Sequence, residues 1–170
     1  MQIRLILKAI LFTILMPGVG VVLLPYLILS QSEETVWPSL SAMSGFAGVL
    51  GLIGSGILVH CIWTFAVRGK GTLAPADPPK ILVVRGLYGH TRNPMYVAVV
   101  VVLMSEAMFF GSTALLIYAG VGFLGFHLFV LGYEEPHLRR QFGGLYEQYC
   151  RAVPRWGVAL RPFTPPDRTP

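Results

Sequence analysis

The chain has 170 residues, of which 54% are hydrophobic and 12% are charged, with a formal net charge of +5. Soluble domains average about 25% charged residues, so this composition excludes an ordinary soluble domain. The mean hydropathy of +0.65 points the same way. The length allows a single domain, and we therefore expect one membrane domain over residues 1–170.

Four apolar stretches follow one another, and each approaches or exceeds the roughly 20 residues that a membrane-spanning helix needs. They lie at 3–29, 41–67, 94–110 and 112–133. We therefore predict an all-α, polytopic membrane protein with about four transmembrane helices, in which residues 1–67 form an N-terminal helical hairpin.

The first stretch carries Pro17, Gly18, Gly20 and Pro25, which predict a kinked or broken helix. It is too long for a signal peptide and has no cleavage pattern near its end, so we expect a retained membrane helix. The turn at 111–112 is tight, which predicts an antiparallel hairpin of the last two helices.

The basic residues indicate the topology. The 13 Lys and Arg residues lie in the N-terminal end, in the 68–93 loop or after residue 138, whereas the 30–40 loop has only Glu33 and Glu34. By the positive-inside rule, both termini and the 68–93 loop face the cytoplasm. We expect a bacterial inner-membrane protein. Nucleic acid is not an expected partner, because the basic residues are dispersed and accompany no recognition motif.

Small residues form a stripe on the second apolar stretch, where Ala47, Gly51 and Ser55 recur every four residues. Such a stripe favours close helix packing in lipid. The alternative is a backbone surface laid against a flat ligand. Cys61 and Cys150 have no partner at metal-binding spacing, so we expect free thiols and no metal site.

The 68–93 loop is long and rich in Gly and Pro, which argues against a regular helix. Its apolar residues 81–84 predict a short extended piece and a lid packed against the helix ends. Arg92, near the end of this loop, suits a membrane surface.

The segment after the fourth apolar stretch begins with Glu134 and Glu135, and Pro136 is predicted to break the helix there. An apolar stripe then predicts an interfacial amphipathic helix that lies on the membrane or folds under the bundle. Its members are Leu138, Phe142, Leu145, Tyr149 and Ala152. Residues 157–170, which end in a Pro-rich run, are predicted to be a frayed tail.

Two histidines fall inside apolar stretches, His60 and His127, and ionisable residues in a membrane are functional candidates. His127 precedes Glu134 by two helical turns on the same face. Together with the polar turn "RNPMY" at 92–96, these residues predict a polar pocket that opens to the cytoplasm above apolar helices.

The motifs "RGLYGHTRNPMY" and "YEEPHLRRQFGGLYEQYCRAVPRW" resemble the membrane methyltransferases related to isoprenylcysteine carboxyl methyltransferase and the phospholipid N-methyltransferases. The resemblance covers about residues 69 to 156. It makes residues 68–156 a methyltransferase-like, cofactor-binding region. It implies S-adenosylmethionine as cofactor, S-adenosylhomocysteine as product, and transfer to a lipophilic, membrane-dissolved acceptor.

The resemblance also assigns residues. The cofactor would be bound by Tyr88, Asn93, Pro94, Tyr96, Glu134 and Glu135, and by Gly54 and Gly56 of a G-x-G element. His127 would lie toward the acceptor, where it could remove a proton from an ammonium group or position the acceptor. The alternative is a packed histidine bonded to a neighbouring element.

Two departures bear on the acceptor. Val130 stands where the isoprenylcysteine enzymes have a substrate-contacting arginine, and Asn93 stands where they have histidine. A prenylcysteine carboxylate is therefore not favoured over an amine head group, a small lipophilic acid or a thiol. Two other functions are weighed below methyl transfer: an NADPH-dependent, sterol-reductase-like oxidoreductase, and a non-catalytic four-helix membrane protein.

Overall fold

The computed structural model describes residues 17–31, 41–64 and 81–165. The regular elements in these ranges are all helical, as the composition predicts. They are the π-helix η1 (Gly18–Leu23), α2 (Leu24–Ser30), α3 (Ala42–Thr64), the short 3-10 helix η3 (Gly86–Gly89), α4 (Pro94–Phe110), α5 (Thr113–Phe129), the π turn η4 (Val130–Glu134), α6 (Glu135–Phe142) and α7 (Gly144–Ala152). Residues 32–40 of the 30–40 loop and residues 68–80 of the predicted lid lie outside the described residues.

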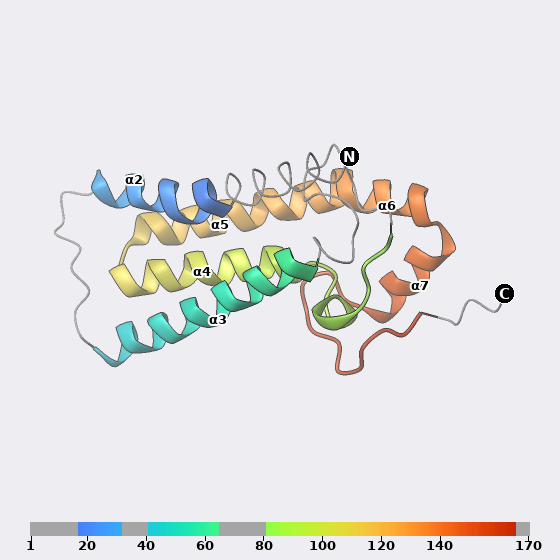
Figure 1. Ribbon diagram of the computed structural model, residues 1–170. Coiled ribbons are helices and arrows are strands. Elements are labelled where there is room, and N and C mark those ends of the chain that lie inside the picture. The colour runs from blue at the N-terminus through green and yellow to red at the C-terminus, as the bar shows by residue number, and fades with distance from the viewer. Residues whose placement is uncertain (1–16, 32–40, 65–80, 166–170) are drawn as a thin grey trace, which may run out of the picture.

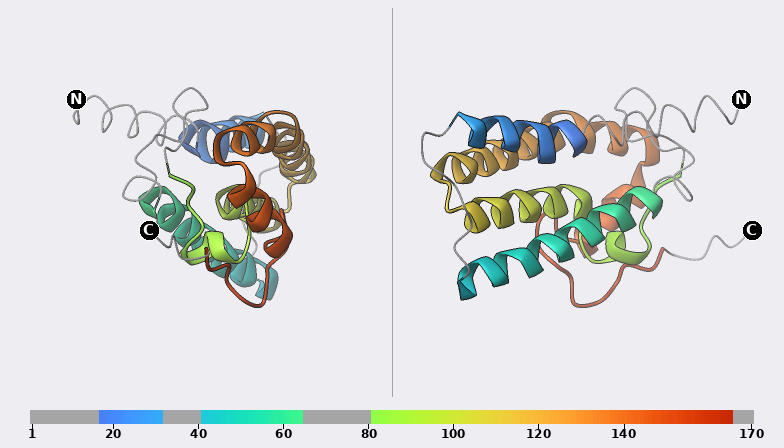
Figure 2. Two further views of the ribbon diagram at one scale, coloured as in Figure 1. Left: turned by 90° about the vertical axis from the view of Figure 1, so that its right-hand side faces the viewer. Right: turned by 60° about the vertical axis from the view of Figure 1, so that its left-hand side comes forward.

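The long helices form an elongated bundle, in which α3 packs on α4, α4 on α5 and α5 on α2 (Figure 1). Helices α6 and α7, the loop with η3 and the C-terminal segment gather at one end of this bundle. The turned views in Figure 2 show the same grouping. The loop before α4 and the segment after α7 are therefore neighbours in space although they are far apart in the sequence.

Two of the helices are long and apolar enough to cross a membrane: Ala42–Thr64, and the continuous run Thr113–Phe142. Gly18–Ser30 and Pro94–Phe110 are apolar but shorter. Many large apolar side chains on α3 and α5 are exposed, among them Leu52, Trp63 and Ile117, as expected of helices that face lipid. The described part of the chain thus has two candidate membrane spans, while the count of four stays a prediction.

The predicted hairpin of the third and fourth apolar stretches is confirmed. Gly111 ends α4 in the left-handed conformation, with φ of 62°, which glycine adopts without steric cost. Ser112 then caps α5 by accepting a hydrogen bond from the backbone N–H of Leu115 at 3.3 Å. These two positions form the turn between α4 and α5.

The interface between α3 and α4 depends on small residues of α3. A Cβ atom at Gly51 would lie 2.7 Å from Ser105 Oγ, and one at Gly54 would lie 2.9 Å from Val102 Cγ2. Ala47 is buried on the same face. The packing interpretation therefore holds for these three positions, but Ser55 is exposed and does not belong to the interface. The small residues of the interface, Ala47, Gly51 and Gly54, therefore recur about every 3.5 residues along α3, rather than every four.

This interface gives a matched pair of variants. Gly54→Ala should lower the free energy of unfolding by about 1–3 kcal/mol, because its methyl group would also meet Val101 Cγ1 at 3.0 Å and the Ala98 carbonyl at 3.3 Å. Gly56→Ala meets nothing within 4 Å and should be neutral or stabilising. Unfolding in detergent, followed by circular dichroism, measures both. Equal stability of the two variants would contradict the packing.

The predicted break at Pro136 is wrong, because the helix continues from Thr113 to Phe142. The turn directly before this proline is a π-helix, η4. A proline ring clashes with the carbonyl one helical turn earlier and offers no N–H to it, and a widened π turn removes that conflict without ending the helix. The irregularity predicted for the first stretch takes the same form, since η1 is also a π-helix.

The single amphipathic helix predicted after Pro136 is also wrong: α6 and α7 are separate helices. Gly143, with φ of 54°, separates them. The predicted apolar stripe still contributes to one core, since Leu138 and Phe142 pack against the buried cluster Val84, Tyr146, Tyr149 and Val153. The apolar face thus folds under the bundle, where the 81–84 piece covers it, and Ala152 is exposed.

Candidate active site

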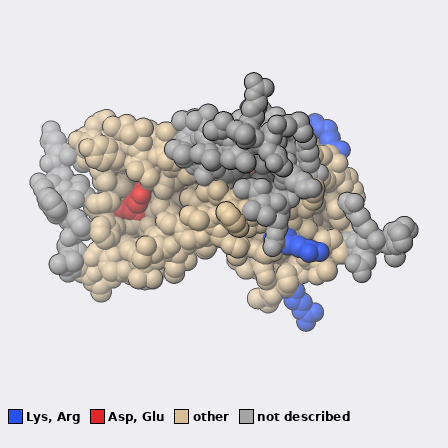
Figure 3. Space-filling view, viewed as in Figure 1, with Lys and Arg blue, Asp and Glu red and all other residues tan. Residues whose placement is uncertain are grey.

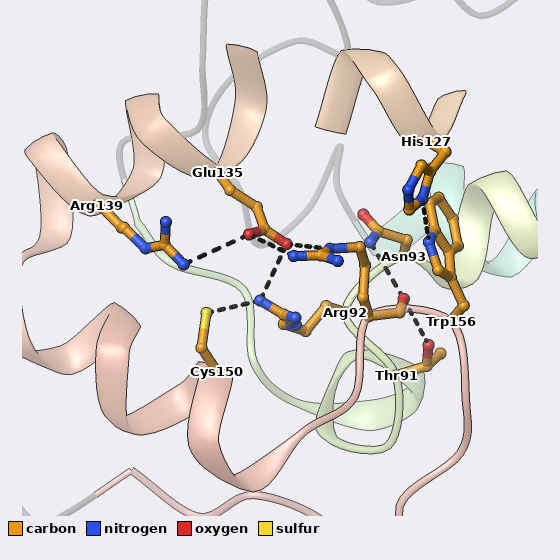
Figure 4. A network of polar contacts seen from close by, with 9 residues as sticks. Thr91, Arg92, Asn93, His127, Glu135, Arg139, Cys150 and Trp156 are labelled. Atoms are coloured by element: carbon orange, nitrogen blue, oxygen red, sulfur yellow. Dashed lines mark hydrogen bonds and ion pairs between the residues drawn. The ribbon is translucent and has the colours of Figure 1, made fainter. Parts of the chain in front are cut away.

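Glu135 is the centre of a buried ion-pair network (Figure 4). Its side chain is 3% exposed. Arg155 donates to both of its oxygens, with Nε to Oε1 at 2.6 Å and a terminal nitrogen to Oε2 at 2.9 Å. Arg92 lies 3.1 Å from Oε1, and Arg139 lies 3.6 Å from Oε2. Three cations therefore surround this one carboxylate, which leaves it little capacity for a ligand.

The sequence interpretation of Arg92 as a membrane-surface residue is wrong. Its side chain is only 11% exposed, and it donates to Cys150 Sγ at 2.7 Å as well as pairing with Glu135. The network thus joins three parts of the chain: the loop before α4, helix α6, and the segment after α7. Because a buried charge needs a partner, the two arginines of the loop and the C-terminal segment depend on Glu135.

The C-terminal segment is also tied to the loop by its backbone. The N–H groups of Ala159 and Phe163 donate to the carbonyls of His90 and Gly89 at 2.7 and 2.9 Å, and Arg92 donates its N–H to the Pro154 carbonyl at 3.0 Å. Phe163 packs against the buried cluster. The prediction of a frayed tail therefore fails up to this point. Composition alone could not show that the backbone donors have partners in a distant loop.

Glu134 lies in different surroundings from its neighbour. It accepts a hydrogen bond from the Tyr96 hydroxyl at 3.0 Å, and it makes no ion pair with any described residue. The Tyr96 ring stacks on Phe126, with ring centroids 4.7 Å apart. A carboxylate with one neutral donor and an aromatic wall is suited to a cationic ligand, because it lacks the countercharge that Glu135 already has.

Tyr88 lies beside this carboxylate. Its side chain is buried, and burial, together with the nearby Cys61 and the charge of Glu134, raises the pKa of Tyr88 well above its ordinary value. The phenol therefore stays protonated. The backbone carbonyl of Tyr88 accepts a hydrogen bond from the Tyr149 hydroxyl, which fixes η3 on α7.

An apolar cleft starts at Tyr96 and runs between η1, α4 and α5. Its volume is about 600 Å³ when its open mouth is included. The lining residues are Pro17, Gly20, Val21, Leu58, Met95, Tyr96, Val99, Leu103, Tyr118, Gly122 and Phe126. Since Tyr96 also bonds Glu134, the apolar cleft and the acidic group meet at this tyrosine.

His127 is held by a tryptophan from the C-terminal segment. Trp156 Nε1 donates to His127 Nδ1 at 2.9 Å (Figure 4). An indole nitrogen can only donate, so the imidazole nitrogen that faces it is unprotonated, and in the neutral ring the other nitrogen carries the hydrogen. In this tautomer the Nε2–H group of His127 is the hydrogen-bond donor. Its role toward an acceptor stays a prediction.

The structure brings some of the predicted site residues together and not others. Tyr88, Tyr96 and Glu134 converge. Asn93 and Pro94 begin α4 beside them, but the Asn93 amide donates to the Arg155 carbonyl at 3.2 Å, so it also holds the C-terminal segment. Gly54 is covered by α4. Gly56 and His60 are exposed on α3, and neither belongs to this group.

Sequence reasoning missed Arg92, Arg155, Trp156 and Phe126. Arg92 and Arg155 lay within the recognised motifs, but paired acids near a surplus of basic residues do not show which acid is paired. Trp156 lay within a recognised motif, but nothing in its spacing linked it to His127. Phe126 looked like any other apolar residue of a membrane helix.

The arginines that the structure describes belong to residues 85–92 and 139–161, at the end of the bundle that carries the site, and the lysines lie outside the described residues. In the view of Figure 3 the basic side chains lie in that half of the molecule. This asymmetry agrees with the sequence argument for a cytoplasmic site, and the orientation itself stays a prediction.

Comparison with known proteins adds one match. The family model of the phospholipid methyltransferases matches residues 43–144, a range that includes α3, α4, α5 and both glutamates. No curated protein and no solved structure matches the chain.

Proposed function

Because the chain belongs to the phospholipid methyltransferase family, a family of membrane methyltransferases, we propose that it uses S-adenosylmethionine to methylate a lipophilic acceptor dissolved in the membrane. The cofactor contributes a methyl group on a sulfonium, which the acceptor displaces. The chain itself has to hold two reactants of opposite solubility in line and keep water away.

The observation that carries this proposal is the contrast between the paired glutamates. Glu135 is saturated by three arginines, whereas Glu134 accepts only the Tyr96 hydroxyl from the described residues. A cofactor with an ammonium group and a sulfonium fits the unpaired acid, and the stacked pair Tyr96–Phe126 offers an aromatic face to a cation. We assign Glu134, Tyr96 and Tyr88 to the cofactor, while Glu135 supports the site through its arginines.

The cleft supports a lipophilic acceptor. Apart from its tyrosines it is lined by apolar side chains and glycines, and it reaches Glu134 through Tyr96. An acceptor in this cleft would approach the cofactor from inside the membrane, while the cofactor would come from the polar end. We propose a phospholipid amine head group, a carboxylate of the isoprenylcysteine kind or a thiol as the methylated group.

S-adenosylhomocysteine should raise the thermal midpoint of the purified protein, because a ligand that binds only the folded state stabilises it by about 2.7 kcal/mol at a hundredfold excess over its Kd. NADPH at the same concentration is the control, since it would stabilise a reductase. No shift with S-adenosylhomocysteine in a well-folded sample would overturn the proposal. A shift with NADPH alone would favour the oxidoreductase.

A further inference from the structure

Glu106 is the only Asp, Glu, Lys or Arg among the described residues of α2, α3, α4 and α5. Its Oε2 atom is buried and has no hydrogen-bond partner among the described residues. An ionisable group in such surroundings is costly, and membrane proteins retain one mainly where it binds something. The residues of the proposed methyl-transfer site do not include it, so it needs an explanation of its own.

Glu106 is not itself a lining residue of the cleft, but it lies about one helical turn beyond the lining residue Leu103 on α4. Tyr96, Val99 and Leu103 line the cleft from α4, and Glu106 continues the same helical face at the next step of three residues. Tyr118 lines the cleft from α5 and lies close enough to interact with the charge of Glu106. Figure 3 shows acidic atoms in a hollow of the half that carries no basic side chain.

Helices α2, α3, α4 and α5 contain no lysine or arginine that could pair with this carboxylate. Residues 9–67 and 94–138 contain neither lysine nor arginine. Tyr118 cannot turn its hydrogen to the carboxylate without giving up its bond to the Gly20 carbonyl, to which it donates at 2.8 Å. Among the described residues no cation pairs with Glu106, so the amine of a ligand is a chemically matched partner for this carboxylate.

We propose that Glu106, beside Tyr118, binds the protonated amine of an elongated lipophilic ligand that fills the cleft. Glu106 follows Tyr96 by ten positions, which correspond to about 15 Å along α4 at roughly 1.5 Å per residue. The inference rests on the proposed function in taking the cleft as the acceptor site. The acceptor would then carry an amine remote from the group that is methylated.

The test compares dodecylamine with dodecanol, which share a chain and differ in the cationic end. Their binding to the full chain in phosphatidylcholine nanodiscs is measured by equilibrium dialysis of the labelled probes. Glu106→Gln should weaken dodecylamine binding about tenfold, the loss expected for a charge-assisted hydrogen bond, and leave dodecanol binding unchanged. Glu134→Gln should retain the preference for dodecylamine over dodecanol, which would show that this preference depends on Glu106 and not on Glu134.

Gly122→Leu tests the cleft without touching the charge. A Cβ atom there lies 3.9 Å from Leu103 Cδ1, so a leucine side chain would fill the cleft between its two ends and weaken both probes. Equal binding of the two probes to the wild type, or an amine preference that survives Glu106→Gln, would overturn the inference. If Glu106→Gln does not fold, undiminished amine binding by Gly122→Leu would overturn it instead. S-adenosylhomocysteine titration of the same samples tests methyl transfer separately.

Discussion

Glu135→Gln should lower the free energy of unfolding by about 3–5 kcal/mol, the usual cost of removing one partner from a buried ion pair. The amide keeps the shape of the carboxylate but leaves Arg92 and Arg155 without their countercharge. Both arginines belong to segments that close the polar end of the bundle, so we expect the loop and the C-terminal segment to loosen together. Denaturant unfolding in mixed micelles measures the change.

The control is Glu147→Gln, which makes the same chemical change at an exposed position of α7. A surface substitution of this kind should alter stability by no more than about 0.5 kcal/mol. Tryptic cleavage after Arg155 provides a local readout, because Arg155 is bonded to Glu135 and becomes accessible when the C-terminal segment is released before the bundle unfolds. If the two variants were equally stable, the network would not hold the segment.

The sequence allowed the helices to be predicted well because their signal is local. Apolar runs with turn residues between them identified α3, α4 and α5 to within a few residues, and the turn at Gly111 followed from its own chemistry. The two errors at Pro136 and Gly143 concern how a helix responds to a local disturbance. A π turn and a break are both compatible with the same residues, and tertiary packing decides between them.

The site was harder to predict because its pairings are not local. The motif located Tyr96 and Glu134, which are bonded as their joint assignment to the cofactor would require. The resemblance also assigned Glu135 to the cofactor, because nothing in the local sequence shows the arginines that surround that carboxylate. Only the arrival of Arg92 and Arg155 from two other segments makes one acid structural and leaves the other available. The segment after α7 was likewise misjudged because its partners lie in the loop before α4.

Glu134→Gln should weaken cofactor binding without lowering stability, whereas the main effect of Glu135→Gln should be on stability. A carboxylate without a cationic partner destabilises the ligand-free protein. Removing its charge should therefore leave the free energy of unfolding of the ligand-free protein equal or higher. Binding of S-adenosylhomocysteine should nevertheless fall roughly ten- to hundredfold, because hydrogen bonds to a charged group contribute about 1.5–3 kcal/mol.

Isothermal titration of both variants measures this difference. Tyr96→Phe is a third variant, for which we expect a smaller loss of binding. That variant keeps the ring that stacks on Phe126 and removes only the hydroxyl bonded to Glu134, so it should weaken binding less than loss of the charge. Sites that await a charged ligand are commonly stabilised when their charge is removed, at the expense of function. If Glu134→Gln binds S-adenosylhomocysteine as tightly as the wild type, the cofactor does not lie at this carboxylate.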